Sequence, residues 1–118
     1  MRLHTELVGE WPPRAVFLHG LLGRGRNWHL VAKALADAGH SSLLVDLPNH
    51  GASDWTDHFS YAQLADQVAA ELRELVPDRR IALVGHSMGG KIAMLIALRH
   101  WELVHKLVVI DIAPSQSA

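Results

Sequence analysis

Four continuous runs of apolar residues mark the chain, with no regular alternation of apolar and polar positions. They span residues 15–19, 42–46, 81–85 and 106–111. Continuous apolar runs are typical of strands that are buried on both faces, as in a parallel sheet covered by helices. The pattern therefore predicts four parallel strands.

Helical spacing of apolar residues fills the stretches between these runs. Residues 27–38 form one candidate helix that ends at Gly39, a residue favoured at helix C-termini. A second begins at Ser60, where Ser60 and Gln63 make a capping box, and ends before Pro77. The apolar positions of the first helix are Leu30, Val31, Ala34, Leu35 and Ala38.

A third candidate helix starts near residue 87 and is apolar on most of its circumference, which predicts a buried helix. Alternating strands and helices indicate an α/β fold, a mostly parallel sheet with helices on both faces and a switch point beside the first strand. Ligands of such sheets bind at the carboxyl ends of the strands. A chain of 118 residues fits one domain.

The strongest chemical motif is Gly85-His86-Ser87-Met88-Gly89, between the third predicted strand and the apolar helix. A Gly-x-Ser-x-Gly pattern alone is weak, but strand, turn and helix are the setting that a nucleophile elbow needs. The sharp turn puts Ser87 in a strained conformation, and Gly85 and Gly89 remove Cβ atoms that would collide with nearby backbone. Ser87 is therefore a candidate nucleophile.

Two backbone amides are candidates for an oxyanion hole. The Met88 N–H lies at the start of a helix, where unpaired amides and the helix dipole favour negative charge. The segment His19-Gly20-Leu21 follows the first strand, and Gly20 permits a tight path on which the Leu21 N–H can point to the same place. The alternative for His19 and Gly20 is a simple strand-ending turn.

Four motifs in order resemble successive signatures of the α/β-hydrolase superfamily, most closely its small esterase and thioesterase branch. The resemblance implies that Ser87 is an acyl-accepting nucleophile for esters or thioesters, without a cofactor, and that the Leu21 and Met88 amides bind the oxyanion. It implies that His19 and His86 shape the site. The motifs are His19-Gly20-Leu21-Leu22-Gly23 with Asn27-Trp28, Asp46 to Ser53, Gly85 to Gly90, and Val109 to Pro114.

A serine nucleophile of this superfamily works with an acid and a histidine base, and the sequence offers a candidate for the acid only. The resemblance makes Asp111 a candidate acid, with equal weight for a structural role in which it braces the loop before Pro114. The superfamily order is serine, acid, histidine, with the histidine after the last strand, and no histidine after Asp111 is present. We therefore expect residues 1–118 to form a single partial domain that ends after the fourth parallel strand, whose exposed edge permits self-association.

Two other readings stay open. The chain is a catalytically inactive fragment if it lacks the triad histidine. A more distant alternative is a degenerate phosphate-binding loop, because Gly85 to Lys91 matches Gly-x-x-x-x-Gly-Lys while Ile92 replaces the magnesium-binding Ser or Thr.

The composition excludes several classes of binding partner. A net charge of −1 provides no broad field for nucleic acid. The absence of cysteine fits the cytoplasm, and no apolar run approaches the ~20 residues of a membrane span. No metal-ligand spacing occurs, so no metal site is expected. Trp28 and Trp55 follow loops at the catalytic face, where they can line an acyl pocket, although core or lid contacts are the commoner role for aromatic residues. His100 and His105 are expected to be solvated.

Overall fold

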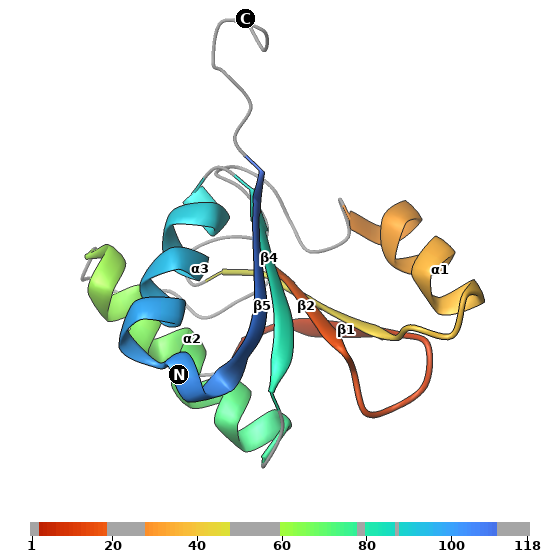
Figure 1. The fold of residues 1–118 in the computed structure, drawn as a ribbon, viewed down its shortest axis with the longest axis horizontal. Helices are drawn as coiled ribbons and strands as arrows, with labels where there is room; N and C mark the ends of the chain where they lie inside the picture. Colours follow the sequence, from red (N-terminus) through yellow and green to blue (C-terminus); the bar gives the residue numbers. More distant parts are fainter. Residues whose placement is uncertain (1–2, 19–27, 48–59, 78–79, 87, 111–118) are drawn as a thin grey trace, which may run out of the picture.

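The computed structural model describes residues 3–18, 28–47, 60–77, 80–86 and 88–110, and these ranges contain one five-stranded sheet (Figure 1). The strand order is β1-β3-β2-β4-β5. Strand β1 is antiparallel to β3, and the other three pairings are parallel. The strands are β1 (Thr5–Val8), β2 (Ala15–Leu18), β3 (Ser42–Val45), β4 (Ile81–His86) and β5 (Val104–Ile110).

The four parallel strands and the switch point beside the first of them are confirmed, since β2 lies between β3 and β4. Strand β1 is an addition that the sequence did not predict. Its four residues include Thr5 and the exposed Glu6, so the apolar signal is weak. Its place is fixed by antiparallel backbone pairing, in which Thr5 faces Val45.

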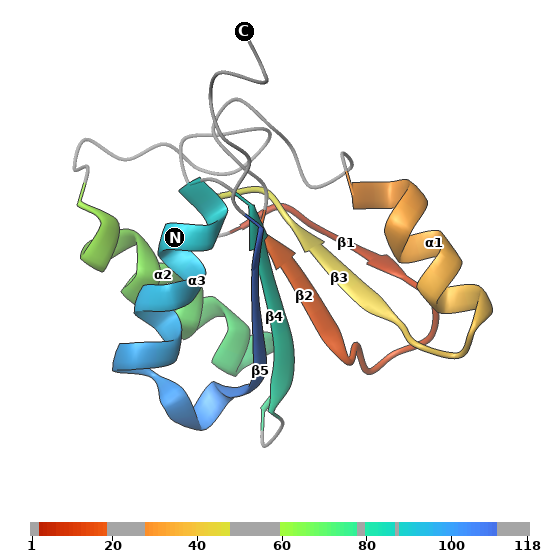
Figure 2. The same cartoon turned by 45° about the horizontal axis from the view of Figure 1, so that its top comes forward.

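Helices cover both faces of the sheet (Figure 2). Helices α2 (Tyr61–Leu75) and α3 (Met88–Arg99) pack on one face, and α1 (His29–Asp37) lies on the other. A short 3₁₀ helix, η2 (Trp101–Leu103), joins α3 to β5. The α/β class, with a mostly parallel sheet between helical layers, is therefore confirmed.

Local sequence signals set the bounds of α2 well. The Ser60 side chain accepts a hydrogen bond from the Gln63 N–H at 3.4 Å, as a capping residue does. The helix ends at Leu75, two residues before Pro77. None of the helices in the described ranges has the length and apolar content that crossing a bilayer requires.

The apolar positions of α1 are not all buried against the sheet. Leu30 is 83% exposed and Val31 is also exposed, whereas Ala32 is fully buried and Leu35 packs beside it. The helix contacts the sheet along a narrow stripe centred on Ala32. The side chains of Leu30 and Val31 therefore stay exposed to solvent.

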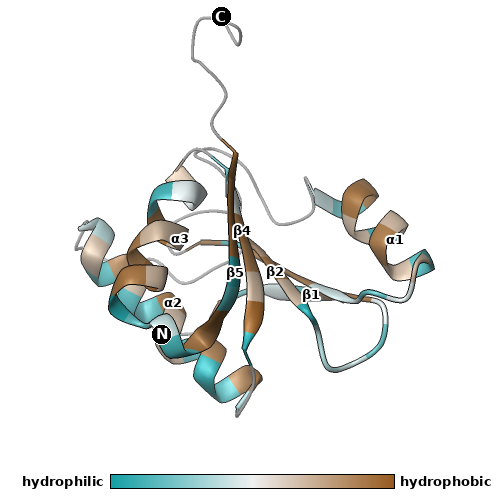
Figure 3. Cartoon of the chain, in the orientation of Figure 1, coloured by the Kyte–Doolittle hydropathy of each residue, from teal (hydrophilic) through white to brown (hydrophobic). Residues whose placement is uncertain are grey.

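Helix α3 is buried on one side only, which corrects the expectation of a wholly buried helix. Ile92, Ala93 and Ile96 are inaccessible to solvent, whereas Leu98 is 78% exposed. Strand β5 is apolar over much of its length (Figure 3), yet the consecutive residues Leu107, Val108 and Val109 are all exposed, so this strand is incompletely covered on both faces. The β5 strand ends the strand order, so its outer edge is unpaired within the described part of the chain. Self-association through this edge stays a prediction.

The largest hydrophobic cluster fills the space between the sheet and the α2–α3 layer. Its fully buried side chains come from both helices and from the three central strands. A smaller cluster of Phe17, Ala32 and Leu44 lies on the α1 face. The main cluster carries most of the hydrophobic stabilisation, because the buried apolar area there is larger.

A network of charged side chains ties α2 to α3. Asp66 on α2 accepts hydrogen bonds from Nε and Nη2 of Arg99 at 2.9 and 2.7 Å, and lies 2.7 Å from Nε2 of His100. Arg73 on α2 pairs with Glu102 and lies 3.1 Å from Nδ1 of His100. The expectation that His100 is solvated is therefore wrong, because α2 supplies a partner for each ring nitrogen.

Side-chain truncation on α3 should separate its two sides. We predict that Ile96→Ala lowers the free energy of unfolding by about 2–5 kcal/mol, because it leaves a cavity in the main cluster. Leu98→Ala, on the same helix but exposed, should change it by less than about 0.5 kcal/mol. Urea unfolding followed by circular dichroism measures both, and equal losses would contradict the burial of the two residues.

The Asp66 cluster should make stability depend on pH in acid. Hydrogen bonds from Arg99 and then His100 hold the pKa of Asp66 well below its usual range. Such a carboxyl contributes stability above its unfolded pKa of about 3.9 and loses it as pH falls toward the folded value. We predict that Asp66→Asn is less stable than the wild type at neutral pH and that the gap closes as pH falls below about 4.

The control is Glu74→Gln on the same helix, since Glu74 makes no ion pair with the described residues. The free energy of unfolding of Glu74→Gln, measured by urea unfolding at each pH, should follow that of the wild type from neutral pH to pH ~3. A gap between wild type and Asp66→Asn that stays constant down to pH ~3 would contradict the prediction.

Candidate active site

The carboxyl ends of the parallel strands meet at one edge of the sheet. In the pairing register Leu18, the last residue of β2, faces both Val45 of β3 and Gly85 of β4. His86 at the end of β4 faces Ile110 at the end of β5. The carboxyl ends of β2, β4 and β5 therefore lie next to one another, which is the arrangement that the motifs required.

Several candidate residues lie outside the described residues. These are His19, Gly20, Leu21, Ser87 and Asp111. Their nearest described neighbours are Leu18, His86, Met88 and Ile110, and the register above brings the strand ends that precede them together. The roles of the five residues stay predictions.

The change from strand to helix around Ser87 takes a single residue. Strand β4 ends at His86 and α3 begins at Met88 (Figure 2). A strand that becomes a helix so abruptly brings the first helical turn close to the end of the strand. This is the strand, turn and helix context that the sequence predicted.

Gly85 is required by that close approach. An added Cβ atom would lie 2.6 Å from the carbonyl carbon of Gly89 and 2.7 Å from Cα of Gly90. Both are backbone atoms, so no side chain could move aside. The structure thus gives Gly85 the steric role that the sequence assigned to it.

Gly90 is a shaping residue that the sequence analysis did not select. A Cβ atom there would lie 2.9 Å from Cγ1 of Val109, so α3 approaches β5 closely at this point. The available signal was the Gly89-Gly90 pair in the first turn of a helix, where glycine is otherwise unfavourable. Gly90 permits the approach of α3 to β5, and Gly85 permits the approach of the first turn of α3 to β4.

The start of α3 offers unpaired amide groups. Met88 is its first residue and is buried, and the first four N–H groups of a helix have no partner within it. Lys91 in the same turn places Nζ 5.5 Å from the ring centre of Tyr61, the first residue of α2. The first turns of the two helices are therefore held together near the edge that carries the candidate site.

Trp28 lies beside the elbow. Its ring centre is 6.0 Å from that of His86, with the planes at 75°, and 5.3 Å from that of Phe17. Trp28 is half-buried against the smaller cluster. Trp28 thus packs on the smaller cluster, the commoner role of aromatic residues, and nothing in the sequence indicated that its partner would be His86.

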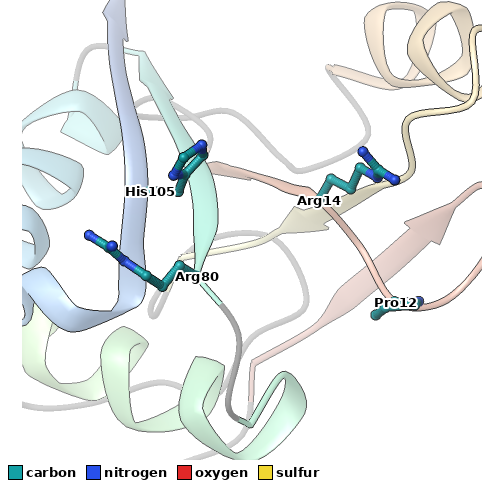
Figure 4. Close-up of a pocket in the computed structure, with 4 residues that line it drawn as sticks. All are labelled: Pro12, Arg14, Arg80 and His105. Carbon is teal, nitrogen blue, oxygen red and sulfur yellow. The ribbon is translucent and has the colours of Figure 1, made fainter.

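A hollow of about 300 Å³ lies at the opposite ends of the strands (Figure 4). Its described lining is Pro12, Arg14, Arg80 and His105. Arg80 donates a hydrogen bond to the Val104 carbonyl at 3.0 Å, and the guanidinium groups of Arg14 and Arg80 point in different directions. They do not form one anion-binding cluster. Within the described ranges, no three His, Cys, Asp or Glu side chains are grouped as metal ligands would be.

Comparison with known proteins gives consistent matches. A family profile for the alpha/beta hydrolase fold matches residues 13–118. The sn-1-specific diacylglycerol lipase ABHD11 of Mus musculus is 45% identical over 105 residues, which cover 86% of this chain and 33% of the relative. The chain thus spans about a third of the length of the curated relatives it matches.

Two solved structures extend the similarity to three dimensions. A marine microorganism esterase superposes with a TM-score of 0.85 at 38% identity, covering 95% of this chain and 42% of that one. A thioesterase domain from the curacin biosynthetic pathway has a TM-score of 0.79 at 31% identity, covering 89% and 40%.

Alanine substitutions at Gly85 and Gly90 should respond differently to a second substitution, Val109→Ala. We predict that Gly90→Ala lowers the free energy of unfolding by about 1–3 kcal/mol through overpacking against Val109. Adding Val109→Ala should recover part of that loss, because it removes the methyl group that the new Cβ meets.

Gly85→Ala is the matched comparison. It should cost at least as much as Gly90→Ala, and Val109→Ala should not rescue it, since its Cβ meets backbone. Stabilities of the single and double variants from urea unfolding form the test. Rescue of both glycine variants, or of neither, would contradict the geometry.

Proposed function

Because the chain belongs to the α/β hydrolase fold family, we propose that it carries the nucleophile of a serine hydrolase that cleaves carboxylic ester or thioester bonds. Ser87 is the nucleophile in this proposal. The observation that supports it best is the single-residue turn between β4 and α3, with Gly85 against the Gly89 carbonyl group. A serine at such a turn lies at the carboxyl edge of the sheet, where ligands of this fold class bind.

The chemistry is acyl transfer in two steps. The Ser87 Oγ forms a bond to the substrate carbonyl carbon while a general base takes its proton. The alcohol or thiol then leaves with that proton, and water hydrolyses the acyl-enzyme in the same manner. In the superfamily order the base is a histidine that follows the acid, and we assign none of the nine histidines of this chain to that role.

Two amides are proposed to bind the negative charge that develops on the carbonyl oxygen. One is the Met88 N–H, at the start of α3 and at the positive end of its dipole. The other is the Leu21 N–H, in the segment that leaves β2 where Leu18 faces Gly85. Loss of one such donor typically lowers the rate by ~10²- to 10³-fold, so both contribute strongly to the proposed activity.

Asp111 is proposed as the acid that orients the base. It directly follows Ile110, which faces His86 in the register of β4 and β5. Asp111 and Ser87 thus each come one residue after a paired position on adjacent strands. This register supports the catalytic role of Asp111 over a purely structural one.

The substrate class is proposed from the relatives. The names of similar proteins include a diacylglycerol lipase, an esterase and a thioesterase domain, all of which cleave an acyl group from oxygen or sulfur. The phosphate-binding-loop alternative has little support, because Ile92 replaces the hydroxyl residue and is fully buried. The remaining alternative is a non-catalytic fragment.

The test is hydrolysis of p-nitrophenyl acetate by the chain and by Ser87→Ala. Where the general base is present, the substitution removes the nucleophile and lowers kcat by about 10³-fold or more; without the base both proteins hydrolyse the ester slowly, and covalent labelling is the deciding measurement. A fluorophosphonate probe should label the wild type once, with the added mass on the peptide that contains Ser87. Equal hydrolysis by the two proteins would favour the non-catalytic alternative.

The matched control is Ser60→Ala, another serine at the start of a helix. Its loss removes the α2 cap, at a cost of about 1 kcal/mol in stability. Hydrolysis and labelling should persist in this variant. Loss of both would show that the assay follows folding rather than Ser87.

A further inference from the structure

Leu18 and Trp28, the described residues on either side of positions 19–27, each contact one of the two residues that precede Ser87. Leu18 pairs with Gly85 in the parallel register of β2 and β4. The ring of Trp28 packs against the ring of His86 at 6.0 Å, with the planes at 75°. Edge-to-face packing at this separation is a favourable geometry for aromatic pairs. These two contacts, on consecutive residues of β4, fix where Leu18 and Trp28 lie relative to Gly85 and His86.

Trp28 is itself held firmly on the sheet. Its ring contacts Phe17 of β2 and packs on the smaller cluster, whose members Phe17, Ala32 and Leu44 are buried. Val84 on β4 packs against the same cluster, two residues before His86 on the same strand face. The indole therefore meets His86 from a fixed position, with β2 behind it and α1 directly after it in the chain.

We propose that Trp28 is a positioning residue of the site, which sets the distance between the elbow at His86–Ser87 and the segment that carries the Leu21 amide. This inference rests on the proposed function. An oxyanion needs its two donors 2.7–3.1 Å away, and a displacement of about 1 Å can cost ~10²-fold in rate. Trp28 does not touch the substrate in this role; it acts through His86 and through the chain that leads to it.

A merely structural role for Trp28 makes a different prediction. If the ring only stabilises the fold, its loss lowers the fraction of folded molecules, and each folded molecule keeps its full rate. If the ring positions the segment, each folded molecule becomes slower in the acyl-transfer step while ground-state binding is little affected. The rate per reactive site therefore separates the two roles.

The experiment compares Trp28→Ala, Trp28→Phe and the control Trp101→Ala, which removes an exposed tryptophan from η2. Fluorophosphonate titration counts the reactive sites, and p-nitrophenyl acetate hydrolysis gives kcat per site and KM. We expect kcat per site to fall about 10- to 100-fold in Trp28→Ala, with KM within about twofold. Trp28→Phe, which retains an aromatic ring and keeps the fold if alanine does not, should recover most of the rate. Trp101→Ala should match the wild type.

An unchanged kcat per site in Trp28→Ala would overturn the positioning role while leaving the serine hydrolase intact. The contact itself is tested without activity, by a double-mutant cycle of Trp28→Leu, which removes the ring, and His86→Ala in urea unfolding. Non-additive shifts of the unfolding midpoint support the Trp28–His86 contact, and additive shifts overturn the inference. A wild type without Ser87-dependent turnover but with non-additive shifts would overturn the proposed function alone.

Discussion

The close packing of the Gly89 carbonyl group over Gly85 is the constraint on which the rest of the site depends. A strand can become a helix within one residue only if the first helical turn lies against the end of the strand, where a Cβ atom would collide with backbone. Gly90 adds a second approach, to Val109 on β5. The elbow, the amino end of α3 and the ends of two strands are thereby fixed as one unit.

The strand order places that unit at the edge where the candidate site lies. Because β4 lies between β2 and β5, the segments after all three strands leave the same edge next to the elbow. Residues at the ends of these strands, although far apart in the sequence, are therefore close in space. Trp28 adds a side-chain attachment to this backbone arrangement, since it packs on His86 from the α1 side.

Stability and site geometry draw on different faces of the sheet. The α2–α3 layer contains the larger cluster and the Asp66 network, which holds α3 by its carboxyl end. The α1 face contains a small cluster whose outer member is Trp28. The amino end of α3 is thus fixed by glycine packing and its other end by ion pairs.

The sequence by itself determined the α/β class, the four parallel strands, the start of α2 at Ser60 and the change from strand to helix between His86 and Met88. Each of these depends on local signals: continuous apolar runs, a capping serine, and glycines at fixed spacing. It could not determine which apolar side chains are buried. Leu30, Leu98 and Val108 are as hydrophobic as core residues, yet they are exposed because no other part of the described chain covers them.

Only the tertiary structure decided the contacts between distant segments. Strand β1 depends on pairing with β3, His100 acquires partners from α2, and Trp28 meets His86 across the sheet edge. The role of Gly90 depends on Val109, which lies far away in the sequence and next to it in the structure. Local sequence encodes backbone preference over a few residues, whereas these contacts depend on the order of strands and the direction of crossovers, which no short segment contains.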